Sequence, residues 1–148
     1  MKMPSRIPAG TVYPGILSTI DLLPTFAAMS GDEQPEGQLI DGVDFSAAIS
    51  DPSQPAPRTE LLIYDSTSTL SGMRQGDWKL LINTKESQKI KDATIQAKSK
   101  PLGLGPYLFN LKDVIGETTN LAHEHPEKLK TMLELAQKLY AELPVLSE

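Results

Sequence analysis

The chain has 148 residues, of which 39% are hydrophobic and 22% are charged, and its formal net charge at pH 7 is −5. This length and apolar share suit one globular domain with a hydrophobic core. The negative charge argues against a nucleic-acid partner, because a phosphate backbone attracts a positively charged surface. The absence of cysteine excludes disulfides, cysteine-ligated metals and a thiol nucleophile. No apolar stretch reaches the roughly 18 residues of a membrane span, so we expect no membrane partner.

The first expected helix follows Asp21 and contains a proline. Asp21 is a typical N-cap, and Pro24 then stands at the third helical position, where its missing N–H would have no partner. Gly31 predicts the end of the helix. The apolar residues recur at helical spacing, and we expect the buried face to consist of Leu22, Leu23, Phe26 and Met29.

The next segment, residues 32–57, is rich in turn-forming residues. Asp41-Gly42 predicts a tight turn, and residues 45–49 could form one helical turn. Three prolines then predict a stiff surface connection, at Pro52, Pro55 and Pro57.

Beyond the prolines the hydrophobic pattern changes to the period of two that is typical of strands. Residues 61–64 predict one strand, and residues 73–82 predict a hairpin that turns at residues 75–77. Residues 107–111 predict a further strand. Residues 83–105, between the hairpin and this strand, are polar and Lys-rich and predict a surface loop.

A C-terminal helix is expected over residues 125–143. Pro126 suits its first turn, and apolar residues follow at helical spacing from Leu129 to Leu143. Antiparallel strands with amphipathic helices predict an α+β fold, a small antiparallel sheet packed with helices. We expect a single subdomain over residues 1–148, with a connecting segment and helix in residues 5–50 and strands in residues 58–111.

Three blocks of sequence occur in an order that spans nearly the whole chain. The first comprises Ile-Pro-Ala-Gly-Thr-Val at residues 7–12, Ile-Asp-Leu-Leu-Pro-Thr at 20–25 and Leu-Ile-Asp-Gly-Val-Asp at 39–44. The second is Met-Arg-Gln-Gly-Asp-Trp-Lys-Leu at 73–80. The third runs from Leu-Phe-Asn-Leu-Lys-Asp to Gly-Glu-Thr-Thr-Asn-Leu-Ala within 108–122. Together they resemble the C-terminal portion of the sulfatase family (arylsulfatase-like, in the alkaline-phosphatase-like superfamily), which implies the fold of the sulfatase C-terminal subdomain.

The resemblance implies hydrolysis of sulfate esters by groups that this chain lacks. Sulfatases use a formylglycine, made from Cys or Ser in a Cys/Ser-x-Pro-Ser-Arg sequence, and a divalent cation, usually calcium. In the family these groups precede the first block, so we expect calcium and formylglycine only in a full-length homologue. The chain itself is expected to hold no catalytic residue and no metal ligand, and to be inactive alone. Its expected partner is the missing N-terminal sulfatase domain or a second copy of itself.

One short sequence imitates the nucleophile signature. Pro4-Ser5-Arg6 matches the end of it, but the nucleophile position would be Lys2, which cannot become a formylglycine. No paired carboxylates precede it, and we interpret the match as coincidental.

Arg74 and Lys79 are the best candidates for contact with a sulfated substrate. An Arg guanidinium presents a fork of N–H donors that suits tetrahedral anions. In the alternative that we favour, Trp78 belongs to the core and Arg74 pairs with a carboxylate of the neighbouring domain.

Other polar clusters favour structural roles. His123 and His125 could bind a metal, but no third ligand stands at a useful spacing, and we expect His125 to cap the C-terminal helix. The acidic residues Asp41, Asp44 and Asp51 lack the spacing of a calcium loop, so turn and cap roles are expected.

Two classes of function therefore remain. The first is a structural, cleft-forming part of a sulfatase that lacks the catalytic half. The alternative is a stand-alone, non-catalytic interaction or relict module, which would associate with itself to cover apolar surface.

Overall fold

A computed structural model describes residue 3 and residues 6–32, 40–66, 68–82 and 106–143 of the 148-residue chain. The chain divides into two compact units, Met1–Thr59 and Glu60–Glu148. The predicted Lys-rich loop, and Lys2, Pro4 and Ser5 of the nucleophile-like sequence, lie outside the described residues.

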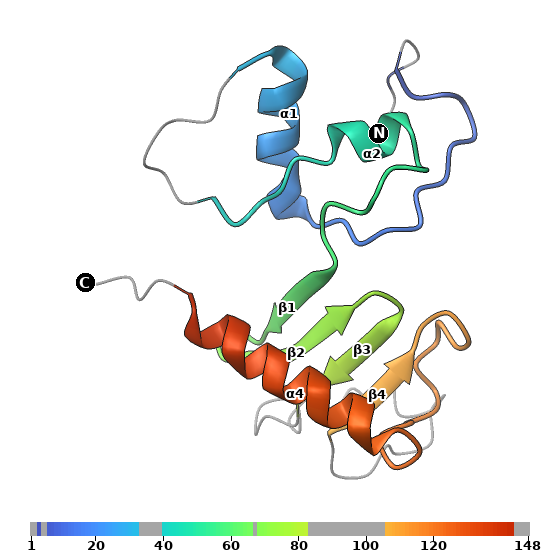
Figure 1. The fold of residues 1–148 in the computed structure, drawn as a ribbon, viewed down its shortest axis with the longest axis vertical. Helices are drawn as coiled ribbons and strands as arrows, with labels where there is room; N and C mark the ends of the chain where they lie inside the picture. Colours follow the sequence, from blue (N-terminus) through green and yellow to red (C-terminus); the bar gives the residue numbers. More distant parts are fainter. Residues whose placement is uncertain (1–2, 4–5, 33–39, 67, 83–105, 144–148) are drawn as a thin grey trace. The chain divides into compact units, whose positions relative to one another are not determined.

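The described residues of the first unit form three short helical segments: the 3-10 turn η1 (Thr19–Asp21), α1 (Leu22–Ser30) and α2 (Ser46–Ser50) (Figure 1). The expected helix after Asp21 is confirmed, with Pro24 in its first turn. Gly31 ends it in the left-handed conformation, at φ 81°, and its N–H donates to carbonyls of the last turn. The helical turn expected at residues 45–49 is also confirmed, shifted by one residue.

The expected buried face of α1 is wrong. Leu22, Leu23 and Phe26 are exposed, whereas Pro24 and Thr25 are buried. The reason is a hydrogen bond, in which the Thr25 hydroxyl accepts the Phe45 N–H. Because of this bond, the chain before α2 packs on the Thr25 side of the helix. A hydrogen bond between distant segments thus overrides the apolar pattern of the helix.

The expected tight turn at Asp41-Gly42 is absent, since no turn is assigned at either residue. The chain passes directly against η1 here. A Cβ at Gly42 would lie 2.1 Å from the Ile20 carbonyl oxygen. Glycine is therefore required at this position for close backbone approach and not for a turn.

The second unit is built on a four-stranded antiparallel sheet in the order β1-β2-β3-β4 (Figure 1). Its strands are β1 (Glu60–Tyr64), β2 (Leu70–Gln75), β3 (Trp78–Leu81) and β4 (Tyr107–Asn110). The predicted strands and hairpin are confirmed, and β2 starts three residues earlier than expected. Because Gln75 pairs with Trp78, the hairpin loop is Gly76-Asp77, with Gly76 at φ 55°.

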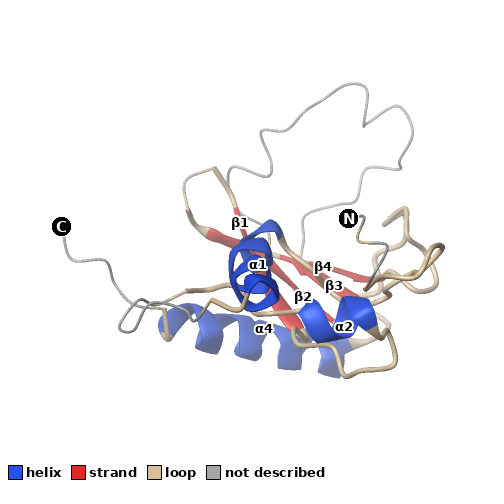
Figure 2. Ribbon diagram, turned by 90° about the horizontal axis from the view of Figure 1, so that it is seen from above, coloured by secondary structure: helices blue, strands red, loops and turns tan. Residues whose placement is uncertain are grey.

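The core of this unit lies between the sheet and α4 (Pro126–Ala141), which runs along one sheet face (Figure 2). Met73, Leu80 and Leu108 are paired across β2, β3 and β4 and have no exposed surface. Met132 and Ala136 of α4 pack against this row and are equally buried. The expected C-terminal helix and the α+β fold are confirmed. No helix among the described residues is long and apolar enough to cross a membrane.

Candidate functional site

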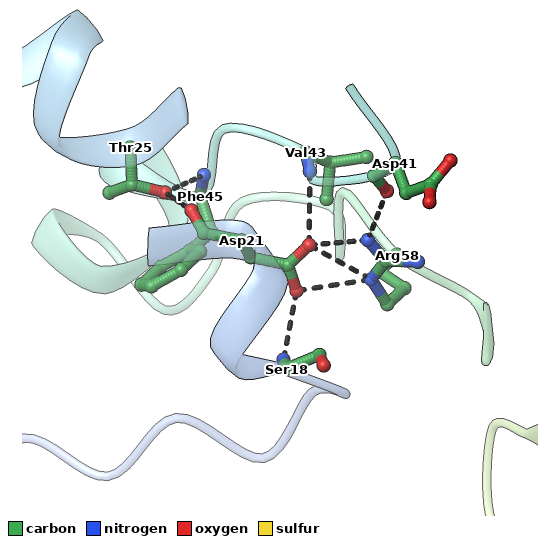
Figure 3. Close-up of polar contacts among 7 residues, drawn as sticks. All are labelled: Ser18, Asp21, Thr25, Asp41, Val43, Phe45 and Arg58. Atoms are coloured by element: carbon green, nitrogen blue, oxygen red, sulfur yellow. Dashed lines mark hydrogen bonds and ion pairs between the residues drawn. The ribbon is translucent and has the colours of Figure 1, made fainter. Parts of the chain in front are cut away.

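The most connected polar group of the first unit is the Asp21 carboxylate, which has no exposed surface (Figure 3). It accepts the Ser18 N–H at 2.8 Å and the Val43 N–H at 3.0 Å. The Arg58 guanidinium forms an ion pair with it, and the distance from Arg58 Nε to Asp21 Oδ2 is 3.0 Å. Asp21 stands at the N-cap of α1 as expected, but its carboxylate makes no capping bond to α1; its bond from Ser18 belongs to a capping box of η1.

Burial and hydrogen bonding act on the Asp21 pKa in opposite directions. Burial raises the pKa of this carboxyl, because a low dielectric disfavours the charged form. The hydrogen bonds from Arg58, Val43 and Ser18, together with the Arg58 charge, outweigh that effect and hold the pKa below its ordinary value of 3.8. Asp21 is therefore a buried, ionised and fully engaged group.

The same cluster joins segments that are distant in the sequence. Arg58 Nη2 also donates to the Asp41 carbonyl, at 2.9 Å. The Thr25 hydroxyl donates to the Asp21 carbonyl at 2.6 Å and accepts the Phe45 N–H at 3.1 Å. Two pieces of the first sequence block, residues 20–25 and 39–44, thus meet at one ion pair. The ion pair therefore holds these two segments together.

Arg58 was missed at the sequence level. It stands in a Pro-rich connection outside the three blocks, and no spacing rule links it to a partner 37 residues away. The only feature of the sequence that points to Arg58 is its position as an isolated basic residue just before the predicted strand at residues 61–64.

The two predicted substrate-binding residues, Arg74 and Lys79, are cross-strand partners on β2 and β3. Both alternate with the core residues Met73 and Leu80, so they lie on the sheet face away from α4. Lys79 Nζ forms an ion pair with Glu117 at 2.7 Å. Arg74 Nε donates to the Gly76 carbonyl at 3.1 Å. The structure thus brings the two cations together and neutralises one of them.

Trp78, the first residue of the inner strand β3, contacts His125, which precedes α4. Their ring centroids are 5.1 Å apart in an edge-to-face arrangement, and Trp78 packs against the core in a half-buried position. His125 occupies the N-cap of α4 as expected, but its side chain makes no capping hydrogen bond. His123 is exposed. The ring contact between Trp78 and His125 favours the structural interpretation of these two residues.

Asn120 of the third block also has a structural role. Its side-chain oxygen accepts the N–H groups of Leu108 and Ala122, both at 3.0 Å, and its amide donates to the Pro106 carbonyl. The side chain therefore fastens the segment before α4 to strand β4.

The described acidic side chains near the two ends of α2 bond to their neighbours in the chain. Among the residues that the structure describes, no group of three or more His, Asp or Glu side chains could hold a metal ion. Asp44 accepts the Ser46 N–H and hydroxyl, and Asp51 binds Ser53 and Gln54, which are the expected turn and cap roles. Hydrogen bonds from Gln54 and Ser53 hold the pKa of Asp51 below its usual value.

The first unit also has an apolar pocket of about 420 Å³. Leu17 and Leu22 contribute to its wall and are themselves exposed. The remaining lining comes from Ile7, Thr11, Tyr13 and Ser18 before η1, from Thr19 in η1, and from Phe45 and Ile49 before and in α2.

Comparison with curated proteins identifies arylsulfatases as relatives, although no protein-family model matches the chain. The chain is 32% identical to arylsulfatase A of Bos taurus over 143 residues, which is 88% of this chain and 28% of the bovine protein. It is 28% identical to arylsulfatase G of Rattus norvegicus over 132 residues, or 84% of this chain and 24% of the rat protein. The chain thus spans about a quarter of the length of these relatives.

Solved structures share the fold. One is Ps i-CgsB, also solved in complex with k-i-k-neocarrahexaose, with TM-score 0.64, 23% identity, and coverage of 92% of this chain and 27% of that one. Another, described under metabolism of multiple glycosaminoglycans by Bacteroides thetaiotaomicron, has TM-score 0.62 and 19% identity and covers 86% and 26%. The fold and the sequence matches together define a sulfatase-like protein. Within that class, the chain corresponds to a partial, C-terminal-type segment and is similar in sequence to arylsulfatases.

Proposed function

We propose that this chain supplies the C-terminal-type part of a sulfatase, a sulfuric ester hydrolase, and forms one side of its active-site cleft. One observation carries the proposal: the similarity to bovine arylsulfatase A extends over 88% of this chain but only 28% of the bovine protein. Such coverage is expected when one polypeptide corresponds to one structural part of a larger enzyme. The antiparallel sheet backed by α4 supports it, because sulfatase structures share this fold.

In this proposal the bond-breaking groups belong to the remainder of the sulfatase. The chain has no cysteine, and several of its described carboxylates are already engaged: Asp44 and Asp51 in local turns, Asp21 with Arg58 and Glu117 with Lys79. The formylglycine and the calcium ion would therefore be held by the N-terminal sulfatase domain, which is the proposed partner. A sulfate ester would be the substrate of the complete enzyme only.

We further propose that Arg74 contributes to anion contact in that enzyme. Of the two predicted residues Arg74 is the stronger candidate, because Glu117 neutralises Lys79. The bond that the structure gives the Arg74 side chain uses Nε and leads to a neutral carbonyl. The terminal N–H groups of a guanidinium suit two oxygens of a sulfate.

The first experiment is a sulfate-release assay with the purified chain. We expect no turnover of an aryl sulfate such as p-nitrophenyl sulfate, with or without added calcium, because the described residues provide no metal cluster and the chain has no thiol. A hybrid of bovine arylsulfatase A, in which this chain replaces the matched 28%, is the comparison, and we expect it to release sulfate. Turnover by the purified chain itself would contradict the proposal that the bond-breaking groups belong to the remainder of the sulfatase.

The second experiment places Arg74→Gln in that hybrid. Loss of a charged hydrogen-bond donor to the substrate should raise KM by about tenfold and leave kcat unchanged. Lys112→Gln is the matched control, since it removes one positive charge from an exposed position. Equal KM values for the two variants would show that Arg74 does not meet the substrate.

A further inference from the structure

Helix α1 exposes the large apolar side chains that an amphipathic helix would normally bury. Its inward side carries Pro24 and Thr25, which are buried, while its large apolar side chains face outward. Leu23 is 65% exposed, Phe26 is 52% exposed and Leu22 is 37% exposed. Each of these side chains forgoes part of the free energy that its burial would provide, so a helix in this state has an unused contact face.

The outward face of α1 continues onto the neighbouring segment. Leu17 and Ile20, which precede α1, are also exposed. Leu17 and Leu22 stand at the wall of the 420 Å³ apolar pocket, so the exposed side chains and the pocket form one apolar surface. Contiguous apolar surface of this kind marks an interaction site. We call it the α1 surface: Leu17, Ile20, Leu22, Leu23, Phe26 and the pocket.

The α1 surface carries no net charge. Residues 16–30 contain one ionisable side chain, Asp21, and that carboxylate is buried against Arg58. A surface without charge and with Leu, Ile and Phe side chains resembles the core of a permanent interface, whereas transient interfaces are more polar. Its partner must therefore present an apolar, uncharged surface and stay bound.

Resting on the proposed function, we infer that the α1 surface docks onto the part of a sulfatase polypeptide that this chain does not span. That part exists in the relatives: the match to bovine arylsulfatase A includes 88% of this chain and leaves 72% of the bovine length unmatched (100% − 28%). A permanent, apolar contact fits an interface within one enzyme. A polysaccharide would need several free polar side chains, whereas the two hydroxyls of α1 already bond within the first unit, Thr25 to the Asp21 carbonyl and Ser30 to the Ala27 carbonyl.

The test compares one double variant, Leu23→Ser with Phe26→Ser, in the isolated chain and in the hybrid arylsulfatase. In the isolated chain both side chains face water, so the melting temperature should stay within about 2 °C, as for surface substitutions in general. In the hybrid the same changes would bury two hydroxyls in an apolar contact, and the yield of soluble enzyme should fall at least tenfold. Ile115→Ser is the matched control, because Ile115 is 87% exposed and lies in the other unit.

The outcomes separate this inference from the function on which it rests. If the unmodified hybrid gives no soluble enzyme, the proposed function fails and the inference fails with it. If the hybrid is soluble and the double variant matches Ile115→Ser, the function stands and the docking surface is refuted. A lowered melting temperature of the isolated variant would mean that this chain already covers the surface. Sedimentation of the isolated chain as a dimer that the double variant dissociates would make a second copy the occupant.

Discussion

At the scale of single residues, the ion pair between Asp21 and Arg58 is the most consequential feature of the first unit. A buried carboxylate is costly unless its oxygens are fully satisfied, and here two backbone N–H groups and a guanidinium do so. The pair contributes little net stability compared with an apolar replacement of the same shape. Its role is to determine which segments lie together, because each of its partners comes from a different stretch of chain.

Removing only one member of this pair should be severely destabilising. We expect Arg58→Ala to lower the free energy of unfolding of the first unit by about 3–5 kcal/mol, because it leaves the Asp21 charge buried without compensation. The measurement is amide hydrogen exchange at Val43, whose N–H donates to Asp21. Arg6→Ala, at an exposed position, is the control.

The double variant Asp21→Asn with Arg58→Ala distinguishes charge burial from lost packing. Removal of the carboxylate charge should restore part of the Val43 protection that Arg58→Ala loses. A double variant that is no more protected than Arg58→Ala alone would contradict the electrostatic explanation and place the effect in the aliphatic stem of Arg58.

The pKa of Asp21 predicts how the first unit responds to acid. Because the folded-state pKa lies below the ordinary value of 3.8, folding favours the ionised form. The stabilisation is complete above about pH 4 and is lost as the pH falls through the lowered folded-state pKa. Asp21→Asn removes this dependence, so the protection of Val43 in that variant should fall less between about pH 5 and pH 3. The two proteins losing protection in parallel over this range would contradict the assignment to Asp21.

At the scale of elements, α1 and α4 show where apolar periodicity succeeds as a predictor and where it fails. Both helices carry apolar residues at helical spacing, and α4 buries that side as expected, with Met132 and Ala136 against the sheet. In α1 the burial is determined instead by the Thr25 hydroxyl and the Asp21 carboxylate. Polar bonds to a distant segment are invisible to a local pattern, which explains the error.

Rules based on neighbouring residues predicted the structure correctly where a turn or a helix end depends only on residues close in the sequence. Gly76 supplies the positive φ of a two-residue hairpin loop, and Gly31 supplies the left-handed end of α1. They failed where a contact spans many residues: Gly42 serves close approach to Ile20, and Arg58 pairs with Asp21. For the candidate site, the sequence placed Arg74 and Lys79 on one hairpin, but it did not reveal that Glu117 holds Lys79.

At the scale of the whole molecule, the chain divides into two units, Met1–Thr59 and Glu60–Glu148, which differ in how well they bury their apolar side chains. The first unit leaves large apolar side chains exposed on α1, whereas the second has a core of its own between α4 and the sheet. The single subdomain expected from the sequence stays a prediction. Because it has its own core, the second unit has the better prospect of folding without a partner.

We therefore expect a fragment of residues 60–148 to fold by itself. Its hydrophobic cluster, which includes Met73, Leu80 and Met132, is drawn entirely from this unit. Its length also exceeds the roughly 40 residues below which a domain usually needs disulfides or metals. Trp78, the only tryptophan, packs against that cluster and reports its unfolding by fluorescence. The fragment should unfold in one cooperative transition in urea, with full-length chain measured alongside as the control. A gradual, non-cooperative change in Trp78 emission would mean that the sheet and α4 require the first unit, and the two units would then be one folding domain.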